Sequence, residues 1–264
     1  MVLLITGAID IRELNVPLTK IIDVNERLLQ YTDSIEYAIT HYESIAEIVF
    51  CENTDFIYDY APLKKKAADY GKKLEILSFK GDYINIQKKG KGFGEGEIIK
   101  YALNKSELLR QSDCFYKLTG RLIVKNMDKI LAATSQKSSF IYYPKSIYKI
   151  SKDHIETYFY KVEKILYIKN LMDAYQEVDE PHFQYLEHVF YERLSNTGLR
   201  SFNIHPVISG FSGTSGDAYE PITKYRLMEN INYFIGVHNL RQTITERVMT
   251  RIFSSLLKIG RLLK

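Results

Sequence analysis

Apolar residues come in short unbroken runs along the first half of the chain, and each run stops at small or polar residues. The runs cover residues 2–9, 47–54, 74–79, 113–126 and 138–144. Their length and continuity are typical of strands buried on both faces. Segments 18–42 and 61–74, and the later part of 88–111, have helical character between these runs. Strands that alternate with helices predict an α/β fold with a mostly parallel sheet flanked by helices.

Helical spacing returns in the second half of the chain. Leu186, Val189, Phe190 and Leu194 predict one helix, and the apolar residues after Arg241 predict another that is amphipathic. We therefore expect one catalytic domain over residues 1–225, with a first half at about 1–126 and a second half at about 127–225. A helical segment over residues 226–264 would follow it.

Charge is concentrated at the C-terminal end. The 264 residues carry a formal charge of +4, and residues 241–264 contain six Lys or Arg and one Glu. That segment carries +5, so the rest of the chain carries −1, which argues against a nucleic-acid groove on the main domain. The opening residues lack the features of a signal peptide, and no apolar run is long enough to span a bilayer. Two cysteines without a metal spacing fit a reducing cytoplasm.

The ends of the predicted strands are the first candidates for a site, because ligands of open α/β sheets bind beyond the carboxyl ends of strands. All four of the first strands end in small, polar or charged residues, although turns favour such residues in any protein. The candidates are Thr6, Gly7, Glu52, Asn53, Ser78, Lys117, Thr119, Gly120 and Arg121.

A glycine-rich stretch, GKGFGEGE at residues 90–97, is the second candidate. Its glycines predict a loop that lets the backbone approach a ligand, just before a helix whose N-terminus would favour phosphate. Gly94 and Glu95 are the residues we assign to ligand binding. The stretch matches neither a phosphate-binding Walker loop nor a dinucleotide fingerprint.

The order of these motifs resembles the nucleotide-sugar domain of GT-A glycosyltransferases. In particular, GEGEIIKYAL followed by YKLTGRLIVKN resembles bacterial enzymes of capsular-polysaccharide and O-antigen synthesis. The resemblance covers roughly residues 1–220 and implies a nucleotide-sugar donor. It implies that Glu52 and Asn53 contact the nucleobase or ribose, with Thr6 and Gly7 beside them.

The metal-binding Asp-x-Asp motif of that fold is missing here. The corresponding place reads Lys117-Leu118-Thr119-Gly120-Arg121. A divalent metal, Mn²⁺ or Mg²⁺, is therefore in doubt, and no metal ligand is assigned. Strand alternation puts Lys117, Thr119 and Arg121 on one side, where the two cations could stabilise a leaving diphosphate.

Residues of the second half supply the remaining chemistry that the resemblance implies. Glu187, near the start of its helix, is the candidate base, and Asp179 with Glu180 is the fallback pair. A glycine- and serine-rich segment at 209–216 is expected to be mobile and to close over the donor phosphates. From it we assign Ser209, Gly210, Ser212 and Gly213. His205, a lone histidine, is more typical of a structural role than of a metal ligand.

Three functions remain open at this level. The leading one is transfer of a sugar from a nucleotide-sugar donor to a surface-polysaccharide acceptor, which the resemblance implies is lipid-linked. A nucleotidyltransferase and a catalytically silent, membrane-attached binding module are the alternatives. Residues 241–264 would hold the protein on the anionic inner face of the cytoplasmic membrane, unless this helix packs on the domain or on a second subunit.

Overall fold

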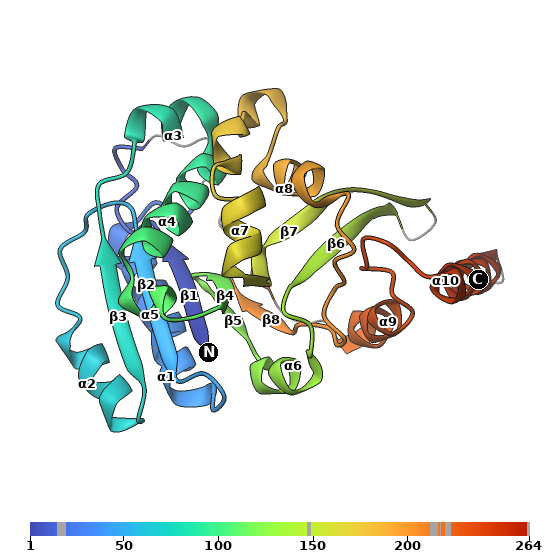
Figure 1. Ribbon diagram of the computed structural model, residues 1–264, viewed down its shortest axis with the longest axis horizontal. Helices are drawn as coiled ribbons and strands as arrows, with labels where there is room; N and C mark the ends of the chain where they lie inside the picture. The colour runs from blue at the N-terminus through green and yellow to red at the C-terminus, as the bar shows by residue number, and fades with distance from the viewer. Residues whose placement is uncertain (15–19, 147–148, 212–215, 217, 220–222, 263–264) are drawn as a thin grey trace.

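The computed structural model describes residues 1–264 apart from 15–19, 147–148, 212–215, 217, 220–222 and 263–264. A six-stranded sheet in the order β3-β2-β1-β4-β7-β6 forms its centre, and β5 and β8 form a second, two-stranded sheet (Figure 1). The strands are β1 (Val2–Gly7), β2 (Glu47–Glu52), β3 (Lys73–Ser78), β4 (Cys114–Thr119), β5 (Leu122–Val124), β6 (Ser139–Ser146), β7 (Lys149–Glu163) and β8 (Ile208–Gly210).

The central sheet is mostly parallel, as the apolar runs predict. β1 pairs in parallel with β2 and β4, and β2 pairs in parallel with β3. β7 is antiparallel to both of its neighbours, β4 and β6, so it alone reverses direction. The carboxyl ends of β1, β2, β3 and β4 therefore meet at one edge of the sheet.

Helices cover both faces of this sheet (Figure 1). The helices are α1 (Val24–His41), α2 (Ala61–Asp69), α3 (Tyr83–Lys89), α4 (Lys91–Lys105), α5 (Glu107–Arg110), α6 (Met127–Ala133), α7 (Lys164–Asn170), α8 (Leu186–Leu194), α9 (Thr223–Phe234) and α10 (Ile244–Leu262). Short 3-10 helices lie at Ala174–Glu177 and Glu180–His182. None of the helices in the described part of the chain is long and apolar enough to cross a membrane.

Alternation along the strands divides the core into two layers. In β1, Val2 and Leu4 belong to the cluster that contains α4 and α8, while Leu3 and Ile5 belong to the cluster that contains α1, α2 and α6. Successive strand side chains point to opposite faces, so every position of a doubly covered strand must be apolar. This explains why the predicted strands read as unbroken apolar runs.

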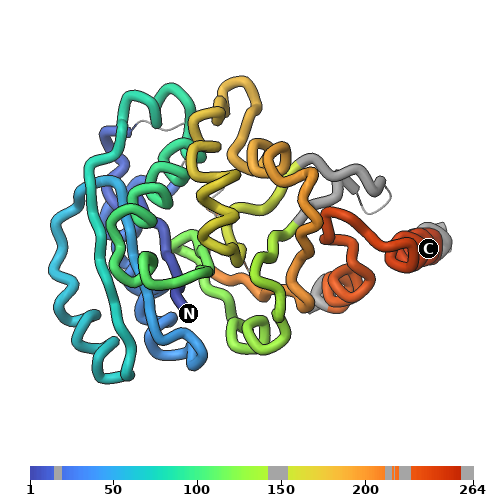
Figure 2. Tube along the Cα trace, in the orientation of Figure 1, coloured from blue at the N-terminus to red at the C-terminus, as the bar shows by residue number. Residues whose placement is uncertain are grey.

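Two boundaries differ from the sequence-based expectation. The first long helix begins at Val24, where the Asp23 carboxylate accepts a hydrogen bond from the Glu26 amide at 2.8 Å and caps the helix. The run 113–126 divides at Gly120, and β5 leaves the central sheet to pair with β8. The tube in Figure 2 follows the chain through this bend and on to the C-terminal helices.

The glycine-rich stretch is helical, so the prediction of a loop there is wrong. Only Gly90 lies outside α4, with a φ of 109°, and Gly92, Gly94 and Gly96 occupy the first two turns. A Cβ on Gly96 would lie 2.1 Å from Cβ of Tyr175. These glycines serve close packing of the helix against its neighbours, which outweighs their low helix propensity.

Candidate active site

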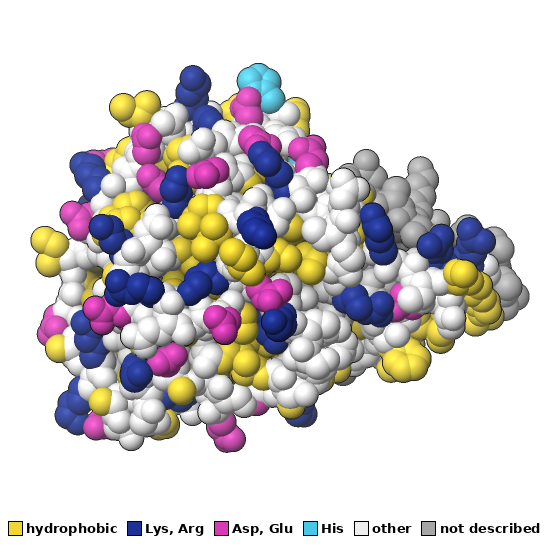
Figure 3. Space-filling view, viewed as in Figure 1, with side chains coloured by type: hydrophobic (Ala, Val, Ile, Leu, Met, Phe, Trp, Pro, Cys, Tyr) yellow, Lys and Arg dark blue, Asp and Glu magenta, His cyan; other side chains and the backbone are white. Residues whose placement is uncertain are grey.

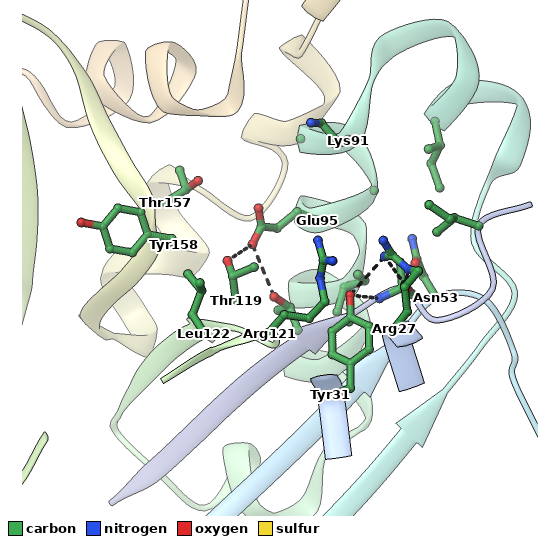
Figure 4. A pocket seen from close by; sticks show the side chains of 18 of the residues that line it. Arg27, Tyr31, Asn53, Lys91, Glu95, Thr119, Arg121, Leu122, Thr157 and Tyr158 are labelled. Carbon is green, nitrogen blue, oxygen red and sulfur yellow. Dashed lines mark hydrogen bonds between the residues drawn. The ribbon is translucent and has the colours of Figure 1, made fainter. Parts of the chain in front are cut away.

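A cavity of about 500 Å³ opens at the carboxyl ends of β1, β2 and β4 (Figure 4). The structure brings together five of the predicted strand-end residues in its lining, namely Thr6, Gly7, Asn53, Thr119 and Arg121. The other walls come from α1, from the first turns of α4, from the middle of β7 and from residues on either side of α8. This is the place where open α/β sheets bind ligands.

Asn53 is the strand-end residue with the most open bonding capacity. Its side chain is buried, lines the cavity, and its Oδ1 has no hydrogen-bond partner among the described residues. Leaving such an acceptor unpaired is costly, and a ligand N–H or O–H would satisfy it.

Glu52 and Ser78 do not line the cavity. The Glu52 carboxylate is fully buried and accepts hydrogen bonds from the Thr54 amide at 2.7 Å, the Phe56 amide at 3.0 Å and the Ser78 hydroxyl. Both side chains therefore hold the turn after β2, and the assignment of either to direct donor contact is corrected by this geometry.

Lys117 is an internal cation, so its assignment as a direct phosphate contact is also wrong. Its side chain is 0% exposed, and its ammonium forms an ion pair with Glu95. It also donates to the Thr119 hydroxyl at 2.9 Å and to the Thr157 carbonyl at 2.6 Å. Strand alternation correctly puts Lys117 and Thr119 on one face of the sheet. That face is covered by α4, which contributes Glu95, and the neighbouring strand β7 contributes Thr157.

Glu95 connects this buried cation to the cavity. Its Oε1 accepts from Lys117. It also accepts, more weakly, from the hydroxyls of Thr119 at 3.2 Å and Thr6 at 3.4 Å (Figure 4). Glu95 lines the cavity, and the buried ammonium group of Lys117 balances its negative charge. The ion pair thus fixes the centre of the cavity floor without leaving a net charge there.

We expect Lys117→Met to lower the free energy of unfolding by about 3 kcal/mol. Removing one partner of a buried pair leaves the other charge uncompensated, although water in the cavity reaches Glu95 and limits the loss. Urea unfolding measures the change. The double variant Lys117→Met/Glu95→Gln should recover at least half of it, and an unchanged stability in the single variant would contradict the role given to the pair.

Two arginines line the cavity near α1. Arg121 lines it and donates one hydrogen bond, to Gln30 at 3.1 Å. Arg27 is 4% exposed and donates to the carbonyls of Ala8, Ile9 and Ile21, which holds the chain after β1. Neither guanidinium pairs with a carboxylate of the described residues. Burial lowers the pKa of Arg27, and the charge of Arg121 nearby adds to that shift.

The start of α4 faces the cavity and is occupied by a carboxylate. The Gly92 amide donates to Glu180 Oε1 at 2.7 Å, and Gly92, Gly94 and Lys91 all line the cavity. Burial lowers the pKa of Lys91, and Glu180 and Glu187 act against that effect. Glu180, from the fallback pair, is therefore a cap of this helix N-terminus.

Glu187 lies where a general base could act. It lines the cavity, and its Oε1 accepts a hydrogen bond from the Thr157 hydroxyl at 2.8 Å. Burial raises the pKa of its carboxyl group, and the charges of Glu95 and Glu180 add to that shift. A carboxylate with a raised pKa in a cavity is a better proton acceptor than an exposed one.

Glu156 is a site residue that the sequence analysis missed. It lies in β7, next to Thr157, and lines the same cavity as Glu187. Burial raises its pKa to about 7, and the charge of Glu187 contributes. The alternation of Ile155, Thr157 and Phe159 with charged or polar residues was the available signal, since it is typical of a strand.

Glu156 should make the protein less stable as the pH rises. Its carboxyl is protonated more readily in the folded chain, with a pKa of about 7, than at the ordinary value of 4.5. Its favourable contribution is complete below pH 4.5 and is lost between that pH and about 7. Glu156→Gln should therefore raise the free energy of unfolding at pH 8, by on the order of 2–3 kcal/mol, and change it little at pH 4.

Thermal or urea unfolding at both pH values measures this difference. Glu192→Gln, an exposed position in α8, is the matched control and should show no such pH dependence. Equal effects of Glu156→Gln at pH 4 and pH 8 would contradict a raised pKa of the half-buried Glu156.

The remaining predicted residues lie elsewhere or outside the described residues. Ser209 and Gly210 form part of β8, paired with β5, instead of a free loop. Ser212 and Gly213 lie outside the described residues. Gly120 does not line the cavity; its amide donates to the Thr6 carbonyl at 2.8 Å, and a Cβ there would lie 2.4 Å from the same oxygen.

Metal ligands do not gather in the described part of the chain. No three side chains of His, Cys, Asp or Glu converge there in a way that could hold an ion. Two of the four carboxylates that line the cavity are committed elsewhere, Glu95 to Lys117 and Glu180 to the N-terminus of α4. These residues do not fit a divalent metal, so we derive no step through one.

Comparisons with known proteins give fold likenesses only. No protein-family model and no curated protein matches the chain. Among solved structures, it is similar to a nucleoside-diphosphate-sugar pyrophosphorylase from Vibrio cholerae RC9, at 13% identity and a TM-score of 0.43 over 76% of this chain and 90% of that one.

Two further solved structures have similar scores. One is a proposed glucose-1-phosphate thymidylyltransferase from Bacillus anthracis, at 9% identity and a TM-score of 0.43 over 93% of this chain and 98% of that one. The other is a proposed nucleotide-diphospho-sugar transferase from Desulfovibrio desulfuricans G20, at 12% identity and a TM-score of 0.39 over 73% and 74% of the two chains. Likenesses of this size assign no activity.

Proposed function

We propose that this protein is a glycosyltransferase that moves a sugar from a nucleotide-sugar donor to the hydroxyl group of a glycan acceptor. The observation that carries the proposal is that one cavity is lined both by guanidinium groups and by carboxyl groups with raised pKa values. Arg27 and Arg121 lie near Tyr31 of α1 (Figure 4), and Glu156 and Glu187 are contributed by β7 and α8. An anionic leaving group and a proton acceptor need these two kinds of group in the same cavity.

The donor would occupy the side of the cavity formed by the ends of β1 and β2. Asn53 Oδ1 would accept a hydrogen bond from the base or ribose, and the Thr6–Ala8 backbone would lie along it. The diphosphate would lie beside Arg121, whose planar guanidinium can contact two phosphate oxygens at once. Lys117 would act from beneath, by fixing Glu95 and Thr119, and would not touch the donor.

The reaction then follows with its charges balanced. The acceptor hydroxyl loses its proton to Glu187 while its oxygen forms a bond to the anomeric carbon. The bond from that carbon to the phosphate oxygen breaks, and the nucleoside diphosphate leaves with the electron pair. Arg121 stabilises the charge that develops on the leaving group, and the raised pKa of Glu187 favours proton uptake.

The acceptor we propose is a surface-polysaccharide intermediate linked to a lipid, as in the enzymes that the sequence resembles. Such an acceptor lies at the inner face of the cytoplasmic membrane, so the enzyme would work there as a peripheral protein. The domain division proposed from the sequence fits this arrangement, with a donor half at about 1–126 and an acceptor half at about 127–225.

A product assay tests the function directly. Purified protein is incubated with each of a panel of UDP-, GDP-, dTDP- and CMP-sugars, with and without EDTA, and release of free nucleotide is measured. We expect release from at least one donor, and we expect it to survive the chelator. Activity lost in EDTA and restored by Mn²⁺ would show that a metal is required.

A parallel assay separates the alternatives. A nucleotidyltransferase would release pyrophosphate from a nucleoside triphosphate and a sugar 1-phosphate, and a binding module would do neither reaction. Thermal shift identifies the nucleotide, because a ligand at a hundred times its Kd stabilises the folded state by about 2.7 kcal/mol. Pyrophosphate release without sugar transfer would overturn the proposal.

A further inference from the structure

Helix α10 presents an apolar face to the solvent. Ile244, Val248, Ile252 and Leu256 follow one another at intervals of four residues, which aligns them on one side of a helix. Their exposed fractions are 80%, 49%, 56% and 60%. A surface helix ordinarily turns such a stripe toward the core.

The opposite side of α10 is polar and is the side that is held by the protein. Thr250 is 5% exposed and accepts a hydrogen bond from Gln242 Nε2 at 2.9 Å. The Glu246 carboxylate accepts from Arg200, from Asn239 Nδ2 at 3.1 Å and from the Thr243 amide at 2.7 Å. The last bond, with the return bond from the Glu246 amide to Thr243 Oγ1, forms a capping box that fixes the helix start.

The amphipathicity of α10 is therefore inverted. The helix is attached through buried polar contacts, and its apolar face remains uncovered by the described residues. Two apolar side chains of α9 are also exposed, Leu227 by 69% and Phe234 by 80%. Figure 3 shows hydrophobic side chains gathered along one edge of the C-terminal part, with Lys and Arg side chains beside them on the last helix.

The charge beside the apolar face indicates what covers it. Arg247 and Arg251 lie in α10 and are exposed, and the single acid of residues 241–264, Glu246, is engaged by Arg200. A second copy of the chain would bring the same positive charge to the contact. An anionic lipid surface supplies the opposite charge and an apolar layer into which the stripe can insert.

We propose that Leu227, Phe234, Ile244, Val248, Ile252 and Leu256 form one docking surface that binds the protein to an anionic membrane. The surface lies in α9 as well as α10, so it is wider than the basic C-terminal segment that the sequence marks. Binding is peripheral and reversible: the apolar side chains enter the headgroup boundary while the arginines contact anionic headgroups. It does not depend on the chemistry proposed for the cavity.

Co-sedimentation of the full-length protein with vesicles tests this surface. We expect binding to phosphatidylglycerol/phosphatidylcholine vesicles at 0.1 M salt, little binding to pure phosphatidylcholine, and weakening at 1 M salt, where the Debye length falls from about 10 Å to about 3 Å. Ile252→Ser/Leu256→Ser should reduce binding at least tenfold. Arg251→Gln should reduce it about fivefold, as expected for one cation near an anionic surface.

Phe234→Ser examines the α9 part of the surface and should also reduce binding. Ile57→Ser is the matched control, because Ile57 is 96% exposed in the segment between β2 and α2, and its loss should change nothing. All five substitutions affect exposed side chains, so unchanged circular dichroism and unchanged nucleotide thermal shifts are expected.

Two outcomes would overturn the proposal. One is that the full-length protein ignores anionic vesicles at low salt. The other is that sedimentation velocity shows a dimer that Ile252→Ser/Leu256→Ser dissociates, which would make the surface a contact between copies of the chain. If the protein does not bind vesicles but releases nucleotide normally, the docking surface is wrong and the proposed reaction stands. If it binds vesicles but releases no nucleotide, the proposed reaction is wrong and the docking surface stands.

Discussion

Glu187→Gln is expected to lower the rate of sugar transfer by about a hundredfold to ten-thousandfold, the usual contribution of a general base. Glutamine preserves the size of the side chain and can keep a hydrogen bond with the Thr157 hydroxyl, but it cannot accept the acceptor's proton. The KM for the donor should change little, because the proposed donor contacts are Asn53 and Arg121 and do not include Glu187. Initial rates with saturating donor measure the effect.

The pH dependence of the same reaction gives an independent reading. Glu187 must be ionised to act as a base, and burial raises its pKa. The rate should therefore rise with pH through a value above the ordinary 4.5 of a glutamate carboxyl and then level off. Glu192→Gln in the same helix is the control and should leave the profile unchanged. Wild-type transfer by Glu187→Gln, or a product that retains the donor's anomeric configuration, would reject the assignment.

Arg121→Ala is the second large effect, with an expected loss of about tenfold to a thousandfold in turnover, as for removal of a donor that stabilises transition-state charge. The fold should survive, because Arg121 makes one hydrogen bond, to Gln30. Removing it also relieves a like charge beside Arg27. The turnover of Arg121→Lys should lie between those of the wild type and Arg121→Ala, since a lysine supplies charge without the bidentate geometry.

Arg110→Ala provides the matched control for this variant. Arg110 is exposed in α5, pairs at 3.9 Å with Glu107 and does not line the cavity. Turnover of that protein should equal the wild type. Near-normal turnover in Arg121→Ala would remove the arginine from the leaving-group site, whereas equal losses in both variants would point to a general effect on folding.

The sheet could be predicted from the sequence because strands that are buried on both faces form continuous apolar runs. The runs that became β1 to β4 are continuous and apolar, and their polar ends lie at one edge because parallel strands share their direction. α8 and α10 were likewise predicted from helical spacing. β7 was not, since its residues 149–163 mix charges with apolar side chains, and with it Glu156 was missed.

The errors at the site have one physical cause. Alternation says which side of a strand a residue occupies, and it does not say whether that side meets a ligand or another side chain. Lys117 was placed correctly beside Thr119, but α4 brings Glu95 over it and turns a candidate phosphate contact into a buried ion pair. Similarly, the Glu52 carboxylate accepts hydrogen bonds from backbone amides of the turn after its own strand, so it does not face the ligand site.

The glycines of α4 also limit how this protein can be engineered. Replacing helical glycines by alanine is a common route to thermostability, because each exchange gains roughly 1 kcal/mol of helix propensity. Here a methyl group on Gly96 would meet Tyr175 at 2.1 Å, and one on Gly92 would meet Leu186 at 2.9 Å. Either would push apart the helix that carries Glu95 and the segment that carries Glu180 and Glu187. Stabilising substitutions should therefore be sought on the outer helices, since in α4 a gain in local helicity would be offset by a wider cavity.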